Sequence, residues 1–320
     1  LRAAQGFDVT LTRLSDVPGT GTAADIKAYV QDAYDNWPTP PSYLLLVGDT
    51  DTIPTWTGSS ANEATDLYYV TMDGTTDYHP DLGRGRFPVR SVAQAEAVVA
   101  KYLTYAGFTG AEAWLKKAAF IASCDDYVTA EGTHNYVSQT HTEPGGYAGI
   151  FPNSPEPGGD KIYCITYGGS ATNIRNAAHD GRWAIIYSGH GSTTGWADGA
   201  VSFSQTDVRN LTDLGFYPFV ASHACVTGQF DVTEAYAETW LLQAGKGALA
   251  VWASADNSYW DEDDTLERAM FDSLFAGAPG EASPYPDVTG MTYDGLAAVE
   301  SAHPSSARYY WETYNIMGDP

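Results

Sequence analysis

Short apolar runs that end in glycine and small polar residues are the feature that most limits what this chain can fold into. Residues 183–187 lead into a Ser-Gly-His-Gly segment that ends at Gly191, and residues 217–220 lead into a small-residue segment that ends at Cys225. Runs of this kind predict buried strands of a parallel α/β sheet, and such sheets carry their chemistry just beyond the carboxyl ends of the strands. We therefore expect His190 and Cys225 to share one sheet edge.

Similar strand-like runs alternate with helix-like stretches through the second part of the chain. The strand-like runs lie near 118–123, 161–166, 183–187, 216–222 and 247–254. The helix-like stretches lie at 172–178, 234–244 and 265–275. This alternation predicts an α/β fold whose sheet is mainly parallel.

The pattern of residues in the first part of the chain predicts a separate, smaller structural unit. Helical patterning at 23–35 and 92–105 flanks a strand-like run that begins at Tyr43, and glycines near position 110 break the second helix. We expect an N-terminal α/β subdomain at 1–110 and a larger catalytic subdomain at 111–320.

The pairing of a cysteine with a histidine predicts acyl transfer. A thiolate attacks carbonyl carbons, and a nearby imidazole can take the thiol proton and later protonate the leaving amine. Cys225 is the expected nucleophile, with a buried structural cysteine as the alternative. His190, between two glycines, is the expected base, with an ordinary loop histidine as the alternative. The resulting oxyanion needs preorganised donors, and the backbone N–H groups of Gly191 and Cys225 are the candidates.

Composition narrows the function classes. The 320 residues are 43% hydrophobic, enough for a large core, and 16 basic against 40 acidic residues give a formal charge of −24. That charge argues against nucleic acid or an anionic membrane as a partner and favours cationic substrates, although it also suits solubility or adaptation to salt. No apolar run is long enough to span a bilayer, and no signal peptide pattern is present.

The chain has three cysteines, too few and too scattered to predict a disulfide framework or a zinc site. At least one must be unpaired. Cys124 and Cys164 belong to apolar strand-like segments, where a cysteine is usually a small core residue. We therefore expect both to be core residues.

Six segments, in the same order along the chain, resemble the gingipains, a family of secreted cysteine peptidases with a caspase–hemoglobinase fold. The segments are 43–49, 66–69, 83–88, 188–192, 221–228 and 314–320. The resemblance implies a caspase-like three-layer α/β/α fold and a secreted or cell-surface endopeptidase. It also implies a thioester acyl-enzyme and cleavage after Arg or Lys. The family has a strand upstream of the segment that resembles residues 1–9, so we expect a processed form with a cleaved N-terminal fragment or propeptide as partner.

The resemblance also suggests roles for residues outside the Cys-His dyad. Asp125 matches an acidic residue that orients the histidine, although a loop carboxylate that caps a turn would look the same. Trp260 matches an aromatic lid over the primary pocket, or is a core residue, and an indole face suits a basic side chain. Glu131 and Asp256 are candidates for the carboxylate that selects that side chain.

His223 is a competitor for the role of base. In a strand, residues 223 and 225 would point to the same face, so the His223 imidazole could reach the thiol. The gingipains have an apolar residue at this position, so His223 departs from their pattern. We expect His190 to be the base.

Structural calcium is a further expectation, because the gingipains bind calcium and carboxylates gather at Asp66, Asp73, Asp77 and Asp81. These spacings lack the pattern of an EF-hand, and a solvated acidic loop accounts for them equally well. His79, near Asp77, could suggest a transition-metal ligand instead, but a lone histidine in a loop is usually a surface residue. We assign no metal ligands, and the proposed chemistry requires no cofactor.

Two other function classes stay open. A sortase-like transpeptidase would use the same dyad and pass the acyl group to an amine instead of water. A non-catalytic surface binding module is suggested by the 22 tyrosines and 9 tryptophans.

Overall fold

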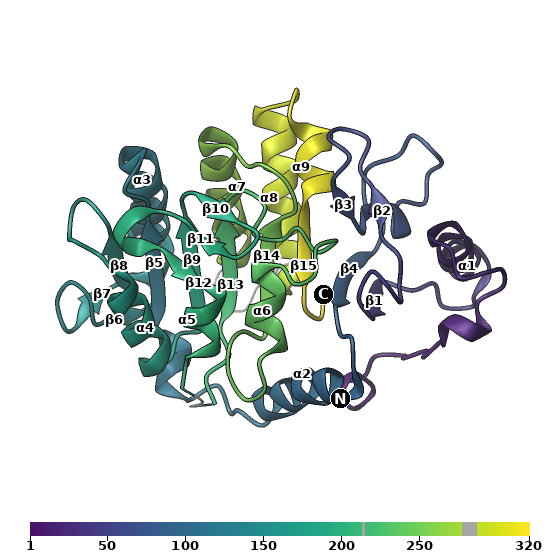
Figure 1. Cartoon of the computed structure of the whole chain (residues 1–320), viewed down its shortest axis with the longest axis horizontal. Coiled ribbons are helices and arrows are strands. Elements are labelled where there is room, and N and C mark those ends of the chain that lie inside the picture. The colour runs from purple at the N-terminus through teal and green to yellow at the C-terminus, as the bar shows by residue number, and fades with distance from the viewer. Residues whose placement is uncertain (213–214, 277–286) are drawn as a thin grey trace.

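A mainly parallel sheet forms the centre of the molecule (Figure 1). The computed structural model describes residues 1–212, 215–276 and 287–320. Within these ranges eight strands form one sheet in the order β1-β4-β15-β14-β13-β9-β5-β8, and only β14 and β15 run antiparallel to each other. The strands are β1 Tyr43–Val47, β4 Gly83–Phe87, β5 Ala118–Ala122, β8 Asp160–Tyr163, β9 Ala184–Ser188, β13 Phe219–His223, β14 Ala250–Ser254 and β15 Tyr314–Met317. The predicted α/β class and mainly parallel sheet are confirmed.

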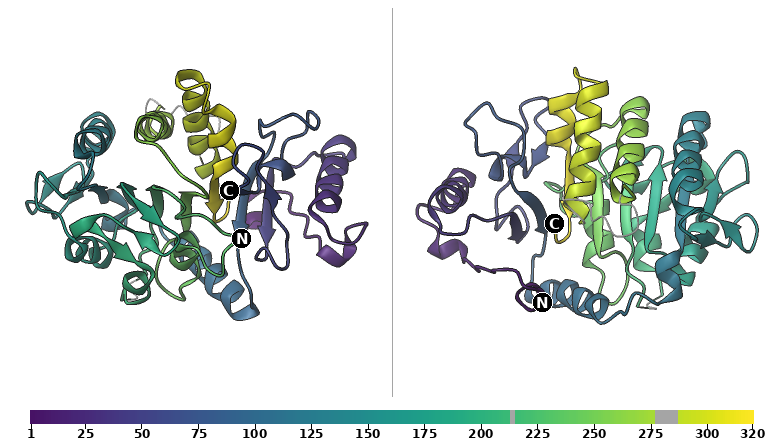
Figure 2. Two further views of the ribbon diagram at one scale, coloured as in Figure 1. Left: turned by 45° about the horizontal axis from the view of Figure 1, so that its top comes forward. Right: turned by 180° about the vertical axis from the view of Figure 1, so that it is seen from behind.

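Helices cover both faces of this sheet (Figure 2). The helices are α1 Ala23–Asn36, α2 Val92–Ala106, α3 Tyr127–Val137, α4 Ala171–Asp180, α5 Gln205–Arg209, α6 Tyr236–Leu242, α7 Trp260–Leu274, α8 Val288–Ala302 and α9 Ala307–Thr313. Successive strand residues alternate between two cores, so Ile185 packs with residues of α2, α4 and α6 while Ile186 packs with residues of α3, α7 and α8. The predicted three-layer α/β/α arrangement is confirmed.

The central strands are buried on both faces, which explains why their sequences are mostly apolar. All five residues of β5, β9, β13 and β14 are buried. Shorter strands lie outside the main sheet: β2 Trp56–Thr57, β3 Ala64–Thr65, β6 Ala148–Gly149, β7 Glu156–Pro157, β10 Gly191–Ser192, β11 Gly195–Trp196 and β12 Phe203–Ser204. Of these, β10, β11 and β12 form a small antiparallel sheet that begins directly after His190. In the described ranges, no helix combines the length and the apolarity that a bilayer span needs.

The last strand, β15, joins the N-terminal and C-terminal parts of the chain in one sheet. β15 pairs with β4 on one side and with β14 on the other, so strands from before and after residue 110 belong to one sheet. A separate apolar cluster, which includes Ile26, Val30 and Leu46, packs α1 against β1. The division into subdomains at 1–110 and 111–320 stays a prediction.

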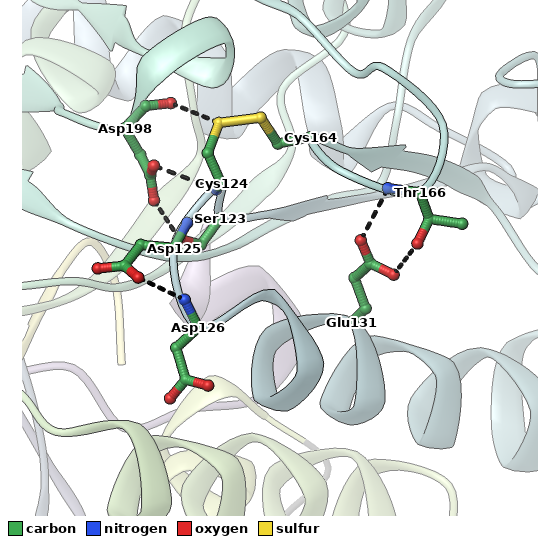
Figure 3. The surroundings of a disulfide bond; sticks show 8 residues. All are labelled: Ser123, Cys124, Asp125, Asp126, Glu131, Cys164, Thr166 and Asp198. Atoms are coloured by element: carbon green, nitrogen blue, oxygen red, sulfur yellow. Dashed lines mark hydrogen bonds between the residues drawn. A yellow bond between two sulfur atoms is a disulfide. The ribbon is translucent and has the colours of Figure 1, made fainter.

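The prediction that Cys124 and Cys164 are separate core residues is wrong, because the two form a disulfide (Figure 3). Cys124 follows β5 by one residue and Cys164 directly follows β8, and these strands are parallel neighbours. Their Cα atoms are therefore 5.0 Å apart, within bridging distance. Cys225 is the free cysteine.

Candidate active site

His190 and Cys225 leave the sheet at the same edge, as the sequence predicts. Strands β9 and β13 are parallel neighbours in which Ser188 pairs with His223. His190 and Cys225 each follow their paired residue by two positions. Parallel strands in register place these two turns side by side at the carboxyl end of the sheet. The His190 side chain is half exposed and Cys225 is partly buried, so both are open to a substrate.

Glycine at position 191 allows the two turns to touch. A Cβ atom at Gly191 would lie 2.5 Å from the carbonyl oxygen of Cys225 and 2.9 Å from the Cβ of Ala224. Real Cβ atoms almost never come so close to a neighbour, so any side chain here would force the adjacent backbone to shift. The backbone of the histidine segment therefore lies directly against Cys225.

The turn that carries Cys225 is also held by hydrogen bonds to the end of β14 and the segment that follows it. Val226 has a left-handed backbone with φ of 52°, which is uncommon for a β-branched residue. Its N–H donates to the carbonyl oxygen of Asp256 at 2.8 Å, and the Gly228 N–H donates to Ser254 at 2.7 Å. These two hydrogen bonds fix the strained turn that presents the thiol.

The same segment contacts both members of the dyad. The Cys225 sulfur accepts from the Ser258 N–H at 3.4 Å and donates to the Ser258 carbonyl at 3.7 Å. Two residues further on, the Trp260 indole meets the His190 ring edge-on, with 5.7 Å between the ring centroids. The structure therefore brings Cys225, His190 and Trp260 together around residues 256–260.

Asp125 lies beside His190. Its Oδ2 accepts from the imidazole Nε2 at 3.1 Å, and this hydrogen bond lowers the pKa of the Asp125 carboxyl below its ordinary value. The contact follows from topology: β5 pairs with β9, so the turn after β5 emerges next to the turn after β9. With Nε2 bonded to Asp125, Nδ1 is the ring nitrogen that is left for another partner.

The candidate pocket carboxylates occupy different places. Glu131 lies in α3 and is buried. Its two oxygens accept from the backbone N–H of Thr166, at 3.2 Å, and from the Thr166 hydroxyl, at 2.5 Å (Figure 3). It is thus bonded to the segment after β8. Asp256 is partly buried beside the Cys225 turn, where its carboxylate accepts from the Asn257 N–H at 2.8 Å.

A third carboxylate, Asp263, escaped the sequence analysis. It lies in the first turn of α7, three residues after Trp260, and is 5% exposed. Its Oδ1 accepts from the hydroxyls of Tyr310 at 3.1 Å and Tyr314 at 2.6 Å, yet burial raises the pKa of the carboxyl to about 7. The signal in the sequence was the spacing from Trp260, since residues three apart share a helix face.

His223 lies on the other side of the strand end. β13 stops at His223 and the chain then turns, so the alternation expected for residues 223 and 225 does not apply. The His223 ring is 1% exposed, and its Nε2 lies 3.6 Å from Glu267, which also bonds His134. In the described part of the chain neither ring nitrogen has a hydrogen-bond partner. The ring is therefore packed under α7 and closed to a substrate.

The buried imidazole predicts acid sensitivity. Burial lowers the pKa of His223 to about 4, whereas an unfolded histidine titrates near 6.5. Between these values the unfolded chain binds a proton that the folded chain does not, so stability falls as pH drops from about 6.5 to about 4, by about 3 kcal/mol in all. We expect His223→Phe to flatten urea-unfolding free energies over that window while cleavage activity is retained. An unchanged acid slope in the variant would contradict this assignment.

Three of the four acidic residues considered for calcium have other partners. Asp66 forms a buried ion pair with Arg86 at 2.7 Å, Asp81 accepts from the Met72 N–H at 2.6 Å, and Asp77 accepts from the His79 N–H at 2.9 Å. Over the residues that the structure describes, no group of three or more His, Cys, Asp or Glu residues could hold a metal ion. These residues do not fit a calcium site.

Known proteins are similar to this chain over almost its full length. Lys-gingipain of Porphyromonas gingivalis is 31% identical over 99% of this chain, and gingipain R2 of the same organism is 26% identical over 99%. The chain spans 19% and 42% of the lengths of those two proteins. A solved complex of the Porphyromonas gingivalis RgpB pro- and mature domains superposes with a TM-score of 0.83 at 25% identity, covering 97% of this chain and 71% of that one.

The sequence as a whole also matches a family model. The model of peptidase family C25 covers residues 1–320, which includes every strand of the sheet and the turns that carry His190 and Cys225. The match extends over the full chain, so it does not depend on the short motifs alone. The resemblance stated from the motifs is confirmed: the chain belongs to peptidase family C25.

Proposed function

We propose that this chain is a cysteine endopeptidase that hydrolyses peptide bonds through Cys225 and His190. The observation that carries the proposal is the contact of three turns at one sheet edge. The Gly191 backbone lies against the Cys225 carbonyl, and Asp125 bonds the far nitrogen of His190. Membership of a peptidase family supports the same reaction class.

The mechanism follows from these contacts. Asp125 holds the imidazole by Nε2, so Nδ1 takes the thiol proton as the sulfur attacks the scissile carbonyl carbon. The N–H groups of Gly191 and Cys225 stabilise the oxyanion. The tetrahedral intermediate collapses to a thioester, and His190 gives the proton to the departing amine. Water, deprotonated by the same imidazole, then hydrolyses the thioester.

The primary pocket is proposed to select Lys or Arg. The Trp260 indole lies beside His190, and an indole face suits an alkyl-ammonium or guanidinium group. Asp256 lies next to the nucleophile turn, and Asp263 is buried on the helix that Trp260 begins. Asp256, partly buried beside the Cys225 turn, is our first choice. Asp263 ranks second, because it already accepts from two tyrosine hydroxyls and burial raises the pKa of its carboxyl to about 7, which disfavours the charged form that would pair with a cation.

The test of this proposal compares fluorogenic peptides that differ only in Lys, Arg, Asn or Asp before the cleaved bond. We expect cleavage after Lys or Arg, and we expect Asp256→Asn to reduce kcat/KM for those peptides by about 10²-fold, because the substrate cation loses its partner. Asp263→Asn is the parallel variant. Glu131→Gln is the matched control, since its carboxylate is bonded to Thr166. Preference for Asn or Asp would refute the basic pocket and leave the dyad standing.

The same assay separates hydrolysis from transpeptidation. Both reactions share the steps up to the thioester, so an added amine nucleophile competes with water only if the site accepts it. We expect hydrolysed product in the presence of glycinamide. Ligated product as the main species would assign the chain to the sortase-like alternative, and no turnover of any peptide would favour a binding module.

The localisation and the partners of the protein are also proposals. We infer a secreted or cell-surface protein that acts on protein or peptide substrates. A related protein has been solved as a complex of pro- and mature domains, which supports a propeptide as a partner here. The chemistry proposed needs a thiol, an imidazole and backbone donors, so calcium has no part in any step.

A further inference from the structure

The contact between Asp125 and His190 needs an explanation, because neither side chain is buried. The Asp125 side chain is 75% exposed and that of His190 is 50% exposed. Exposed ion pairs contribute little by themselves and do not hold two side chains in one geometry. The position of Asp125 must therefore be fixed through the backbone of its own turn, which joins β5 to α3.

The buried side chain of Asp198 holds this turn through hydrogen bonds. It is 5% exposed, and its Oδ1 accepts from the Cys124 N–H at 3.1 Å while its Oδ2 accepts from the Ser123 hydroxyl. The Ser123 Oγ in turn accepts from the Asp125 N–H at 2.8 Å (Figure 3). A Cβ at Gly189 would lie 2.9 Å from the Asp198 Oδ2. Asp198 therefore contacts both the Asp125 turn and the His190 turn.

The Cys124–Cys164 disulfide is a second, covalent constraint on the same turn. Cys124 is the residue immediately before Asp125, and its bond to Cys164 joins the turn to the end of β8. The Asp198 carbonyl oxygen lies 3.4 Å from the Cys124 sulfur, a van der Waals contact because a disulfide sulfur carries no hydrogen. Each residue from 123 to 125 is thus held by a covalent bond or a hydrogen bond.

We propose that the Cys124–Cys164 disulfide, together with Asp198, is a positioning device for Asp125, and that reducing the disulfide weakens the His190–Asp125 contact and slows the Cys225 nucleophile. A dithiol reductant supplies the two electrons and two protons: the sulfur–sulfur bond breaks, two thiols form, and the reductant closes to its own disulfide. Cys225 takes no part in the exchange. The inference rests on the proposed function, since it concerns how fast the same thiol reacts.

The test is a double-mutant cycle read by alkylation of Cys225. The variants are Cys124→Ser/Cys164→Ser, Asp125→Ala, and all three changes together, so that Cys225 is the one thiol in each. The second-order rate with iodoacetamide is measured from pH 5 to 9. We expect disulfide removal to slow alkylation near neutral pH by roughly tenfold, and to slow it no further once Asp125 is absent.

Equal losses with and without Asp125 would overturn the proposal, because they would mean that the disulfide acts on general stability alone. A wild-type rate in Cys124→Ser/Cys164→Ser would overturn it as well. Thiol counting checks the premise: the native protein should show one reactive thiol, and three after dithiol treatment. Melting temperatures of all variants establish that each is folded at the assay temperature.

Asp198 provides an independent variant. Asp198→Asn keeps one acceptor oxygen, so it should preserve more of the alkylation rate than Asp198→Ala, with the same dependence on Asp125. Equal rates in the two variants would count against a positioning role. Alkylation needs no peptide, so a protein that cleaves nothing yet shows the expected cycle would refute the peptidase proposal and leave the positioning proposal intact.

Discussion

Replacing Cys225 with alanine is expected to abolish peptide cleavage, lowering kcat/KM by about 10⁴-fold or more, because no other group in the turn can form the acyl-enzyme. His190→Ala should cost a similar factor, since the thiol proton would have no acceptor. The two losses should not multiply: a double variant is expected to be no slower than either single one, because the residues act as a unit. Initial rates on the fluorogenic peptide that the wild type cleaves fastest provide the measurement.

Two controls make this result specific to the dyad. His223→Phe removes a histidine that is 1% exposed and is expected to keep most of the activity. Circular dichroism and melting temperature should show that Cys225→Ala is as stable as the wild type, since the sulfur contacts only backbone atoms of Ser258 among its hydrogen-bond partners in the described residues. A Cys225→Ala enzyme with more than a few per cent of wild-type activity would refute the mechanism.

The central strands and the placement of His190 and Cys225 at one sheet edge could be predicted because their signals are local. β9 and β13 are buried on both faces, so each appears in the sequence as an unbroken apolar run before a glycine or small residue. Parallel pairing then brings their ends together whatever the intervening chain does. His190 and Cys225 followed directly from this rule.

Two elements that contain buried polar residues, α3 and β4, were not predicted from the sequence. The buried positions of α3 include Glu131 and His134, which break the apolar pattern of an amphipathic helix. β4 has the sequence Gly-Arg-Gly-Arg-Phe, which looks like a loop. It is a buried strand because Arg86 pairs with Asp66 and donates to the Gly48 carbonyl. Such pairings appear only after distant segments have been placed beside each other.

The disulfide and Asp198 were missed for a related reason. Cys124 and Cys164 are 40 positions apart and become neighbours only because β5 and β8 pair in the sheet. Asp198 reaches the same turn from a segment beyond β11. Strand order is a tertiary property that local patterns do not encode, so residues that act through it stay hidden from sequence reasoning.

Gly191→Ala tests the contact between the two catalytic turns. The added Cβ would lie 2.5 Å from the Cys225 carbonyl oxygen, 2.8 Å from the Thr227 Cγ2 and 2.9 Å from the Ala224 Cβ. Backbone must therefore shift at the nucleophile and at a proposed oxyanion donor. We expect kcat to fall by about 10²-fold, the cost of a misplacement of about 1 Å, and stability to fall by about 1–3 kcal/mol.

Gly132→Ala is the matched control for this substitution. Gly132 lies inside α3, and a Cβ there meets nothing within 4 Å. The control should leave kcat unchanged and add about 0.5–1 kcal/mol of stability, because alanine is the better helix former. Unchanged kcat in Gly191→Ala would contradict the close approach of the two turns.

A second substitution separates the effect on activity from the effect on stability. Thr227→Ser in the Gly191→Ala background removes the Cγ2 contact and keeps the hydroxyl that bonds Ser222 at 2.9 Å. The clash with the Cys225 carbonyl remains. We therefore expect the pair of changes to recover part of the melting temperature but little of kcat, since the backbone of the nucleophile stays displaced. Recovery of kcat in step with stability would mean that side-chain crowding at Thr227, and not the position of the Cys225 backbone, limits the variant.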